Sequence, residues 1–95
     1  MPSRDFSRAF KTTMAATIRV KLFARYAELV GTDEATVTVA SPAKVGDVVA
    51  RVRALPGGKD IPERPLVAVN LRQARWDAPV SAGDEIALLP PMSGG

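Results

Sequence analysis

An α+β domain, in which one main helix packs across a mixed sheet of four to five strands, is the fold that the sequence predicts. Two observations lead to it: several short runs have the apolar pattern of strands, and one apolar stripe at helical spacing lies between them. The chain has 95 residues, of which 46% are apolar, so it suits one domain with a modest core. We place this domain at residues 17–89, after an N-terminal extension (1–16) and before an extended tail (90–95).

The first half of the predicted domain begins with two strands. In residues 17–23, apolar side chains at even-numbered positions alternate with Arg19 and other polar residues, which is typical of a half-buried strand. In residues 24–30 the alternation of apolar and polar residues stops, and the segment ends at Gly31. This indicates one or two helical turns. Residues 35–40 are rich in valine and threonine and predict a second strand, so the two strands flank a short connection as in a wide hairpin.

The main helix is predicted to open at Ser41-Pro42, because a proline near a helix start has no N–H that the helix needs. It ends at Pro56-Gly57-Gly58. Its apolar stripe consists of Val45, Val48, Val49, Val52 and Leu55.

Three further strands complete the sheet. The unbroken apolar run 66–70 predicts a central strand buried on both faces, and a short edge strand is expected near 74–76. A turn at 81–84 precedes the last strand, 85–89. We expect the first and last strands to lie side by side and parallel at the centre of the sheet. That arrangement is the β-grasp, or ubiquitin-like, fold.

Composition excludes several classes of function. The chain has no cysteine and no histidine, so it contains no disulfide, no Cys/His metal site and no nucleophile paired with histidine. Residues 1–13 contribute +2 of the net charge of +3, so the predicted domain is nearly balanced and a nucleic-acid partner is not expected. No apolar run approaches the roughly 20 residues that span a membrane, and no secretory signal is present. The expected location is therefore cytoplasmic.

The extension has two interpretations. Residues 1–13 form a flexible tail, which we favour, or else Phe6 and Phe10, four residues apart, mark a short docking helix.

The C-terminal tail has the composition of a reactive end that enters another protein. Pro90 and Pro91 favour an extended path, and Gly94 and Gly95 lack the Cβ atoms that would block a narrow channel. Extended residues from Leu89 onwards reach at most about 23–25 Å. Because the chain has no phosphate-binding loop, any activation of the terminal carboxylate must occur in trans.

The last predicted strand is apolar on both faces. Ile86 and Leu88 share one face and Ala87 and Leu89 share the other, so one pair faces the core and the other is a candidate partner surface. The pattern leaves open which pair does which. The partner-binding residues that we predict are Phe23, Ala87, Leu88, Leu89, Pro90, Pro91, Met92 and Ser93.

Two stretches resemble a known family, the small subunits of molybdopterin synthase. Residues 18–31 resemble the opening of these proteins, and Val69-Asn70, Trp76-Asp77-Ala78-Pro79-Val80 and residues 83–95 resemble their end. The most specific element is Gly83-Asp84-Glu85 followed at fixed distance by Pro90-Pro91 and a terminal Gly94-Gly95. The resemblance covers residues 17–95.

The resemblance implies a sulfur carrier. An adenylyltransferase would adenylate Gly95 with ATP and Mg²⁺, which this chain does not itself bind, and a sulfur donor would convert the adenylate to a thiocarboxylate. The chain would then dock on the synthase large subunit, in a heterotetramer of two small and two large subunits, and pass sulfur to cyclic pyranopterin monophosphate. It implies no catalytic residue beyond the Gly94-Gly95 terminus.

Other functions are compatible with the same tail. A ubiquitin-like modifier would form isopeptide bonds through Gly95, and related carriers serve thiamine, cysteine or tRNA thiolation. A binding module with an inert tail is a further alternative.

Overall fold

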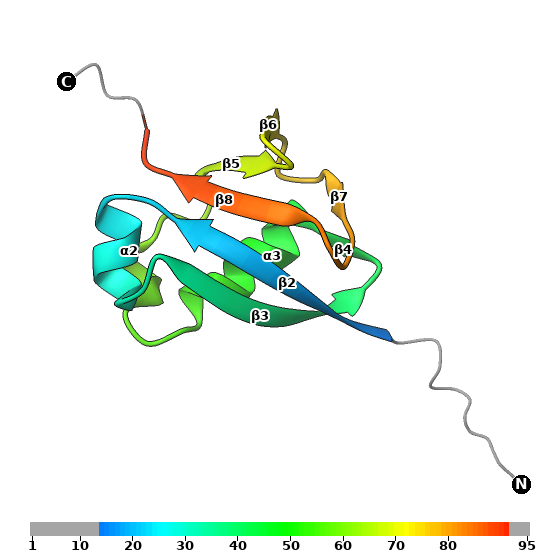
Figure 1. Cartoon of the computed structure of the whole chain (residues 1–95), viewed down its shortest axis with the longest axis horizontal. Coiled ribbons are helices and arrows are strands. Elements are labelled where there is room, and N and C mark those ends of the chain that lie inside the picture. The colour runs from blue at the N-terminus through cyan, green and yellow to red at the C-terminus, as the bar shows by residue number, and fades with distance from the viewer. Residues whose placement is uncertain (1–13, 92–95) are drawn as a thin grey trace, which may run out of the picture.

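The computed structural model describes residues 14–91 and contains one five-stranded mixed sheet with a single longer helix on one face (Figure 1). The strand order is β3-β2-β8-β5-β6, and a separate two-stranded sheet pairs β4 with β7. The elements are β2 (Met14–Leu22), α2 (Arg25–Val30), β3 (Glu34–Ser41), β4 (Ala43–Lys44), α3 (Val45–Arg53), the 3-10 helix η1 (Gly58–Asp60), β5 (Leu66–Val69), β6 (Arg72–Ala74), β7 (Pro79–Val80) and β8 (Glu85–Leu89).

The central prediction is confirmed, because β2 and β8 are parallel neighbours in the middle of the sheet. The wide hairpin is also confirmed: β2 and β3 are antiparallel, with Ile18 opposite Val37 and Val20 opposite Ala35. β5 pairs antiparallel with the other side of β8. This is the β-grasp arrangement that the order of elements predicts.

The core lies between the sheet and α3. The even-numbered positions of β2 alternate with exposed ones, and Ile18 and Val20 have no exposed surface. Four valines of the predicted stripe are buried on α3, whereas Leu55 lies beyond the end of the helix and is only half-buried. The apolar area removed from water at this one interface is the main source of stability.

Several predicted boundaries are wrong. β2 begins at Met14, and residues 14–16, which the sequence pattern places in the extension, pair with residues 39–41 of β3. The helix starts at Val45 and not at Ser41-Pro42, because β4 comes first and the backbone N–H of Lys44 is bonded to the Asp47 carboxylate (2.9 Å). The rest of the extension, with the alternative helix at Phe6 and Phe10, lies outside the described residues.

Two strand predictions also need correction. β5 lies next to the edge strand, not at the centre, and only Val67 in it is fully buried, because no helix within residues 14–91 covers its second face. The edge strand spans residues 72–74, earlier than predicted, so that Val69 pairs with Arg72 across a tight turn. Among the described residues, no helix is long and apolar enough to cross a membrane.

The loop after β6 covers the start of α3. The carbonyl groups of Ala78 and Trp76 accept from the backbone N–H groups of Val45 (2.9 Å) and Gly46 (3.0 Å), two donors that have no partner within the helix. The Trp76 ring is 42% exposed, and the Arg64 guanidinium lies 5.2 Å from its centroid. Trp76 therefore lies in the turn after β6 and not in the edge strand near 74–76 that the sequence predicts.

Candidate functional site

The candidate site begins where β8 ends. β8 lies between β2 and β5, so the chain that follows it leaves from the middle of the sheet, on the same side of the molecule as α2 (Figure 1). Pro90 is half-buried, and Pro91 is exposed and is the last described residue. The predicted partner contacts Met92 and Ser93 and the predicted reactive residues Gly94 and Gly95 lie outside the described residues.

The two faces of β8 differ in burial. Ile86 and Leu88 have no exposed surface and belong to the core, opposite Val20 and Leu22 of β2. The prediction of Leu88 as a partner contact is therefore wrong, because the pleat that buries Ile86 also turns Leu88 towards α3. Ala87 and Leu89 are half-buried and point to the other face. No helix of the described residues covers that face.

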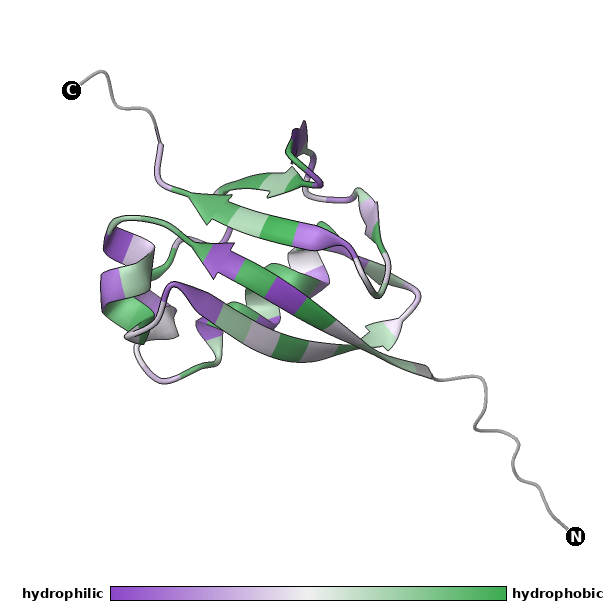
Figure 2. Ribbon diagram, viewed as in Figure 1, coloured by the Kyte–Doolittle hydropathy of each residue, from purple (hydrophilic) through white to green (hydrophobic). Residues whose placement is uncertain are grey.

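Apolar side chains gather on this open face. In the registers of β5 and β8, Ala68 lies opposite Ala87 and Leu66 lies opposite Leu89. A shallow hollow of about 210 Å³ is lined by residues of β5, β6 and β8. In Figure 2 the ribbons of β5 and of the end of β8 are coloured mostly green, because both segments consist of apolar residues. We call this surface the open-face patch and define it as Phe23, Leu66, Ala68, Leu71, Ala87 and Leu89.

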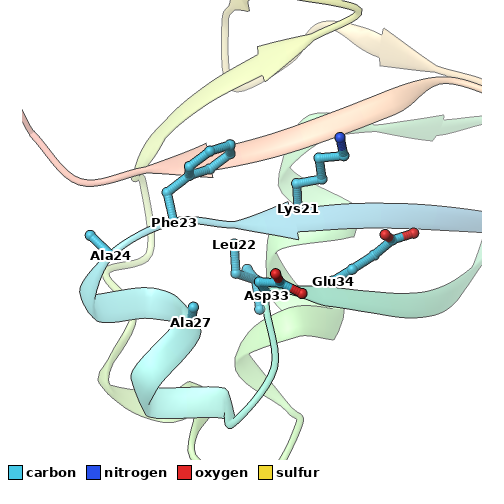
Figure 3. Close-up of a pocket in the computed structure, with 7 residues that line it drawn as sticks. All are labelled: Lys21, Leu22, Phe23, Ala24, Ala27, Asp33 and Glu34. Carbon is cyan, nitrogen blue, oxygen red and sulfur yellow. The ribbon is translucent and has the colours of Figure 1, made fainter.

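Phe23 extends the patch towards α2. It follows β2 with the same parity as Lys21, and Figure 3 shows both side chains pointing away from Leu22, whose side chain is buried. The ring is 43% exposed, as expected for a residue offered to a partner rather than to the core. It borders an open cavity of about 460 Å³ whose acidic rim is formed by Asp33 and Glu34.

Leu71 is the most exposed large apolar side chain in the described part of the chain, at 87%. It follows Asn70 in the β5–β6 turn, and both residues have positive φ, 53° for Asn70 and 72° for Leu71. The Asn70 amide fastens this turn to β8: its Nδ2 donates to Asp84 Oδ1 (3.1 Å), and its Oδ1 accepts from the Glu85 N–H (2.9 Å). The turn therefore holds Leu71 at the margin of the patch.

These hydrogen bonds explain why Asn70 and Gly83-Asp84-Glu85 both belong to the sequence pattern that resembles the synthase small subunits. The second carboxylate oxygen of Asp84 accepts from the Ser81 N–H (2.8 Å), which closes the turn before β8. Gly83 has φ 94°, a conformation that side chains disfavour. Asp84 is thus a turn residue, as predicted.

Charged residues border the patch on the β2 and β3 side. Arg19 pairs with Glu34 (3.6 Å), and Lys21 pairs with Glu85 (3.4 Å). All four side chains are at least 41% exposed, so these pairs contribute little to stability. They form a polar rim beside an apolar centre, which is the usual composition of a protein interface.

Sequence reasoning missed Leu66, Ala68 and Leu71. The run 66–70 predicts a strand buried on both faces, so its second face was assigned to the core. The available signal was Asn70-Leu71: an apolar residue directly after a turn asparagine is poorly placed to reach a core.

The described residues show no catalytic constellation of their own. No group of three or more metal-ligating side chains is present among residues 14–91. Within residues 14–91, a clear shift is found at Tyr26, where burial raises the pKa of the hydroxyl, so the residue stays neutral within the core. What these residues do present is the open-face patch beside the end of β8.

Comparisons with known proteins agree with this description. The ThiS family model matches residues 20–95. SAMP1 from Haloferax volcanii is 30% identical, with a TM-score of 0.73 over 84% of this chain and 100% of that one. A protein described as molybdopterin converting factor, subunit 1, from Pyrococcus furiosus is 25% identical, with a TM-score of 0.69 over 81% and 99%.

A more distant match shares the fold. It comes from the complex of subunits 1 and 2 of molybdopterin-converting factor from Helicobacter pylori, at 21% identity and a TM-score of 0.59 over 83% of this chain and 99% of that one.

Proposed function

The chain belongs to the ThiS family, and from that premise we propose that it is the sulfur-carrying small subunit of a molybdopterin synthase. The family match and the shared fold support a ThiS/MoaD-like sulfur carrier or a ubiquitin-like modifier. The finer assignment rests on the open-face patch and on its position beside the end of β8.

One observation carries the proposal: the apolar side chains that the fold leaves uncovered lie next to the point where the tail begins. Leu89 belongs to both features, because it is the last residue of β8 and a member of the open-face patch. A partner that covers the patch would receive the following residues directly. Extended residues after Leu89 reach about 20 Å, which is enough to enter a buried site in that partner.

The chemistry begins with activation of the Gly95 carboxylate. One carboxylate oxygen attacks the α-phosphorus of ATP, pyrophosphate leaves, and an acyl adenylate forms. ATP and Mg²⁺ belong to the activating adenylyltransferase. A persulfide of the donor then attacks the acyl carbon and AMP leaves, giving an acyl disulfide. A second thiol attacks the donor sulfur of that S–S bond, so the thiocarboxylate leaves and the donor retains a disulfide.

The sulfur then passes to the product in the partner's active site. The thiocarboxylate sulfur would attack a carbon of cyclic pyranopterin monophosphate and displace an oxygen from that carbon. Water would then hydrolyse the acyl–sulfur bond, which leaves the sulfur on the product and returns the Gly95 carboxylate. Gly94 and Gly95 leave the acyl carbon open to attack, since neither carries a side chain. This chain would supply the acyl end and the docking surface, and the large subunit would supply the remaining catalytic groups.

The test is co-purification from the native organism with intact-mass analysis of the bait. We expect a large subunit in the eluate and a bait species about 16 Da heavier, the difference between sulfur and oxygen. A chain lacking Gly95 should still bind the large subunit but show no mass increase. Recovery of the large subunit with neither variant would contradict the proposal.

The resemblance to SAMP1, a small archaeal modifier protein, favours a second candidate, a protein modifier. The same acyl adenylate would then be attacked by a lysine amine, and an isopeptide bond to Gly95 would form. In the same experiment, bait attached covalently to lysines of several proteins, with loss of a water mass per bond, would identify the modifier.

A further inference from the structure

The outer edge of β3 differs from the other free edge of the sheet. β3 has eight residues and no charged residue after Glu34, whereas β6 has three residues and begins with Arg72. Proteins usually protect an edge by shortening it or by placing charges or prolines along it. β6 is protected in this way, and β3 is not.

The hydrogen-bond phase of β3 identifies which backbone groups face outwards. The Leu22 N–H donates to the Asp33 carbonyl (2.9 Å), so in the β2–β3 register every second residue from Asp33 is bonded to β2. The residues between them therefore direct their N–H and C=O groups away from β2. They are Glu34, Thr36, Thr38 and Ala40.

Glu34 confirms this phase, because its N–H and C=O are both bonded to the Thr32 hydroxyl (3.3 and 3.0 Å). Thr36, Thr38 and Ala40 are exposed, and no described strand pairs with their outer side. Their spacing matches the hydrogen-bonding repeat of one further strand. Figure 1 shows β3 as the margin of the sheet with α3 behind it.

A groove accompanies this edge on the helix side. One hollow of about 270 Å³ lies between Thr36–Thr38 and the end of α3, where Ala54 and Leu55 line it. A second, of about 320 Å³, lies between Val39 and Ala50. Alanines on this flank of α3 leave room for a chain beside β3. Arg51 lines both hollows and is exposed, so it marks the midpoint of the groove.

We propose that the outer edge of β3 binds an extended peptide segment of a partner protein by strand addition, with an acidic side chain of the segment at Arg51. Outward backbone groups supply the hydrogen bonds, and alternate side chains of the segment enter the groove. This surface is separate from the open-face patch, so the proposal does not depend on the function proposed above.

Pairing with a second copy of this chain is the competing occupant. A two-fold pairing of β3 with itself about Thr38 would bring both Arg51 side chains close to the symmetry axis, where like charges repel. An acidic segment replaces that repulsion with attraction. Asp47 also lines the second hollow, but its carboxylate accepts from the Lys44 N–H (2.9 Å), whereas Arg51 lines both hollows. The charge of Arg51 therefore favours the peptide.

The test uses the full chain and a blocked heptapeptide, Thr-Val-Thr-Asp-Thr-Val-Thr, whose central aspartate would lie at Arg51. We expect amide chemical-shift changes and slower hydrogen exchange at Thr36, Thr38 and Ala40. Two further peptides carry N-methyl groups, one at the threonines and one at the alternate positions. One of these should lose binding and the other should keep it, because one set of N–H groups faces β3 in a strand.

Matched variants test the edge itself. Thr38→Pro removes an outward N–H without breaking the β2 ladder and should weaken binding about tenfold, whereas Thr38→Ala keeps the N–H and should bind as the wild type does. Arg51→Glu should weaken binding roughly fivefold and favour a peptide with lysine at the centre.

Three results would overturn the proposal: no binding at millimolar peptide, shifts at Ala68 and Ala87 instead of β3, or equal binding by both N-methylated peptides. Concentration-dependent shifts at Thr38 without peptide would show instead that a second copy occupies the edge.

Discussion

The two faces of the sheet are built from the same strands but serve different purposes. On the face towards α3, Val20, Ile86 and Leu88 are fully buried and form one continuous core. On the opposite face, Ala87 and Leu89 are half-buried and lie beside exposed Leu71. Because successive side chains of a strand point to opposite faces, one short strand contributes both to stability and to a surface for a partner. Neighbouring residues of β8 should therefore respond very differently to the same substitution.

Leu88→Ala should give the largest loss of stability. The side chain has no exposed surface, so its truncation leaves a cavity and should lower the free energy of unfolding by about 2–5 kcal/mol. Chemical denaturation followed by far-ultraviolet circular dichroism measures this value. The matched variant is Leu89→Ala, and equal losses for the two variants would contradict the distinction between the faces.

Asn70→Ala should have the next largest effect. It removes two side-chain hydrogen bonds that fasten the β5–β6 turn to β8, at a residue whose φ is 53°. We expect a loss of about 1–2 kcal/mol and faster hydrogen exchange at Glu85. Asn70→Gly tolerates the positive φ but lacks the amide, so a loss in that variant as well would assign the effect to the hydrogen bonds.

Gly46→Ala tests how closely the loop after β6 covers the helix side. A Cβ at this position would lie 2.6 Å from Cζ2 of Trp76, so the ring must shift. We expect a change of about 1 kcal/mol, since the greater helix propensity of alanine offsets part of the strain. Trp76 is the single tryptophan, and a red shift of its fluorescence would report the displacement. Unchanged emission would show that the ring yields without leaving its contact.

Ala68→Glu should change stability by about 0.5 kcal/mol or less, because the side chain points to the open face. Under the proposed function it should nevertheless abolish binding of the large subunit, since a carboxylate would lie in the centre of the apolar patch. Thermal unfolding and co-purification measure the two effects. Thr38→Glu, which places the same charge on the same face at its outer edge, is the control and should retain binding.

Lys21→Gln should have a small effect, on stability alone. The Lys21–Glu85 pair is about half exposed on both sides, so its loss should cost about 0–1 kcal/mol and less at high salt. Denaturation at two salt concentrations measures it. A loss comparable to that of Leu88→Ala would mean that the polar rim is part of the folded core.

The sequence alone determined the elements whose apolar residues all lie on one face, because such an element can bury only that face. Alternation in residues 17–23 assigns a buried face to Ile18, Val20 and Leu22, because the two residues between them, Arg19 and Lys21, are charged. The valine stripe of α3 and the bounds of β8 were likewise predictable. Local periodicity is enough to predict which side chains are buried wherever only one face of an element is apolar.

The tertiary structure decided what local patterns leave undetermined. β8 is apolar on both faces, and only its pairing with β2 and β5 turns Leu88 inwards and Leu89 outwards. Leu66, Ala68 and Leu71 join the patch because β5 lies beside an edge strand and no helix in the described part of the chain covers this face. The outward phase of β3 likewise follows from its register with β2. Register and layer order are properties of several segments together, so no single stretch of sequence encodes them.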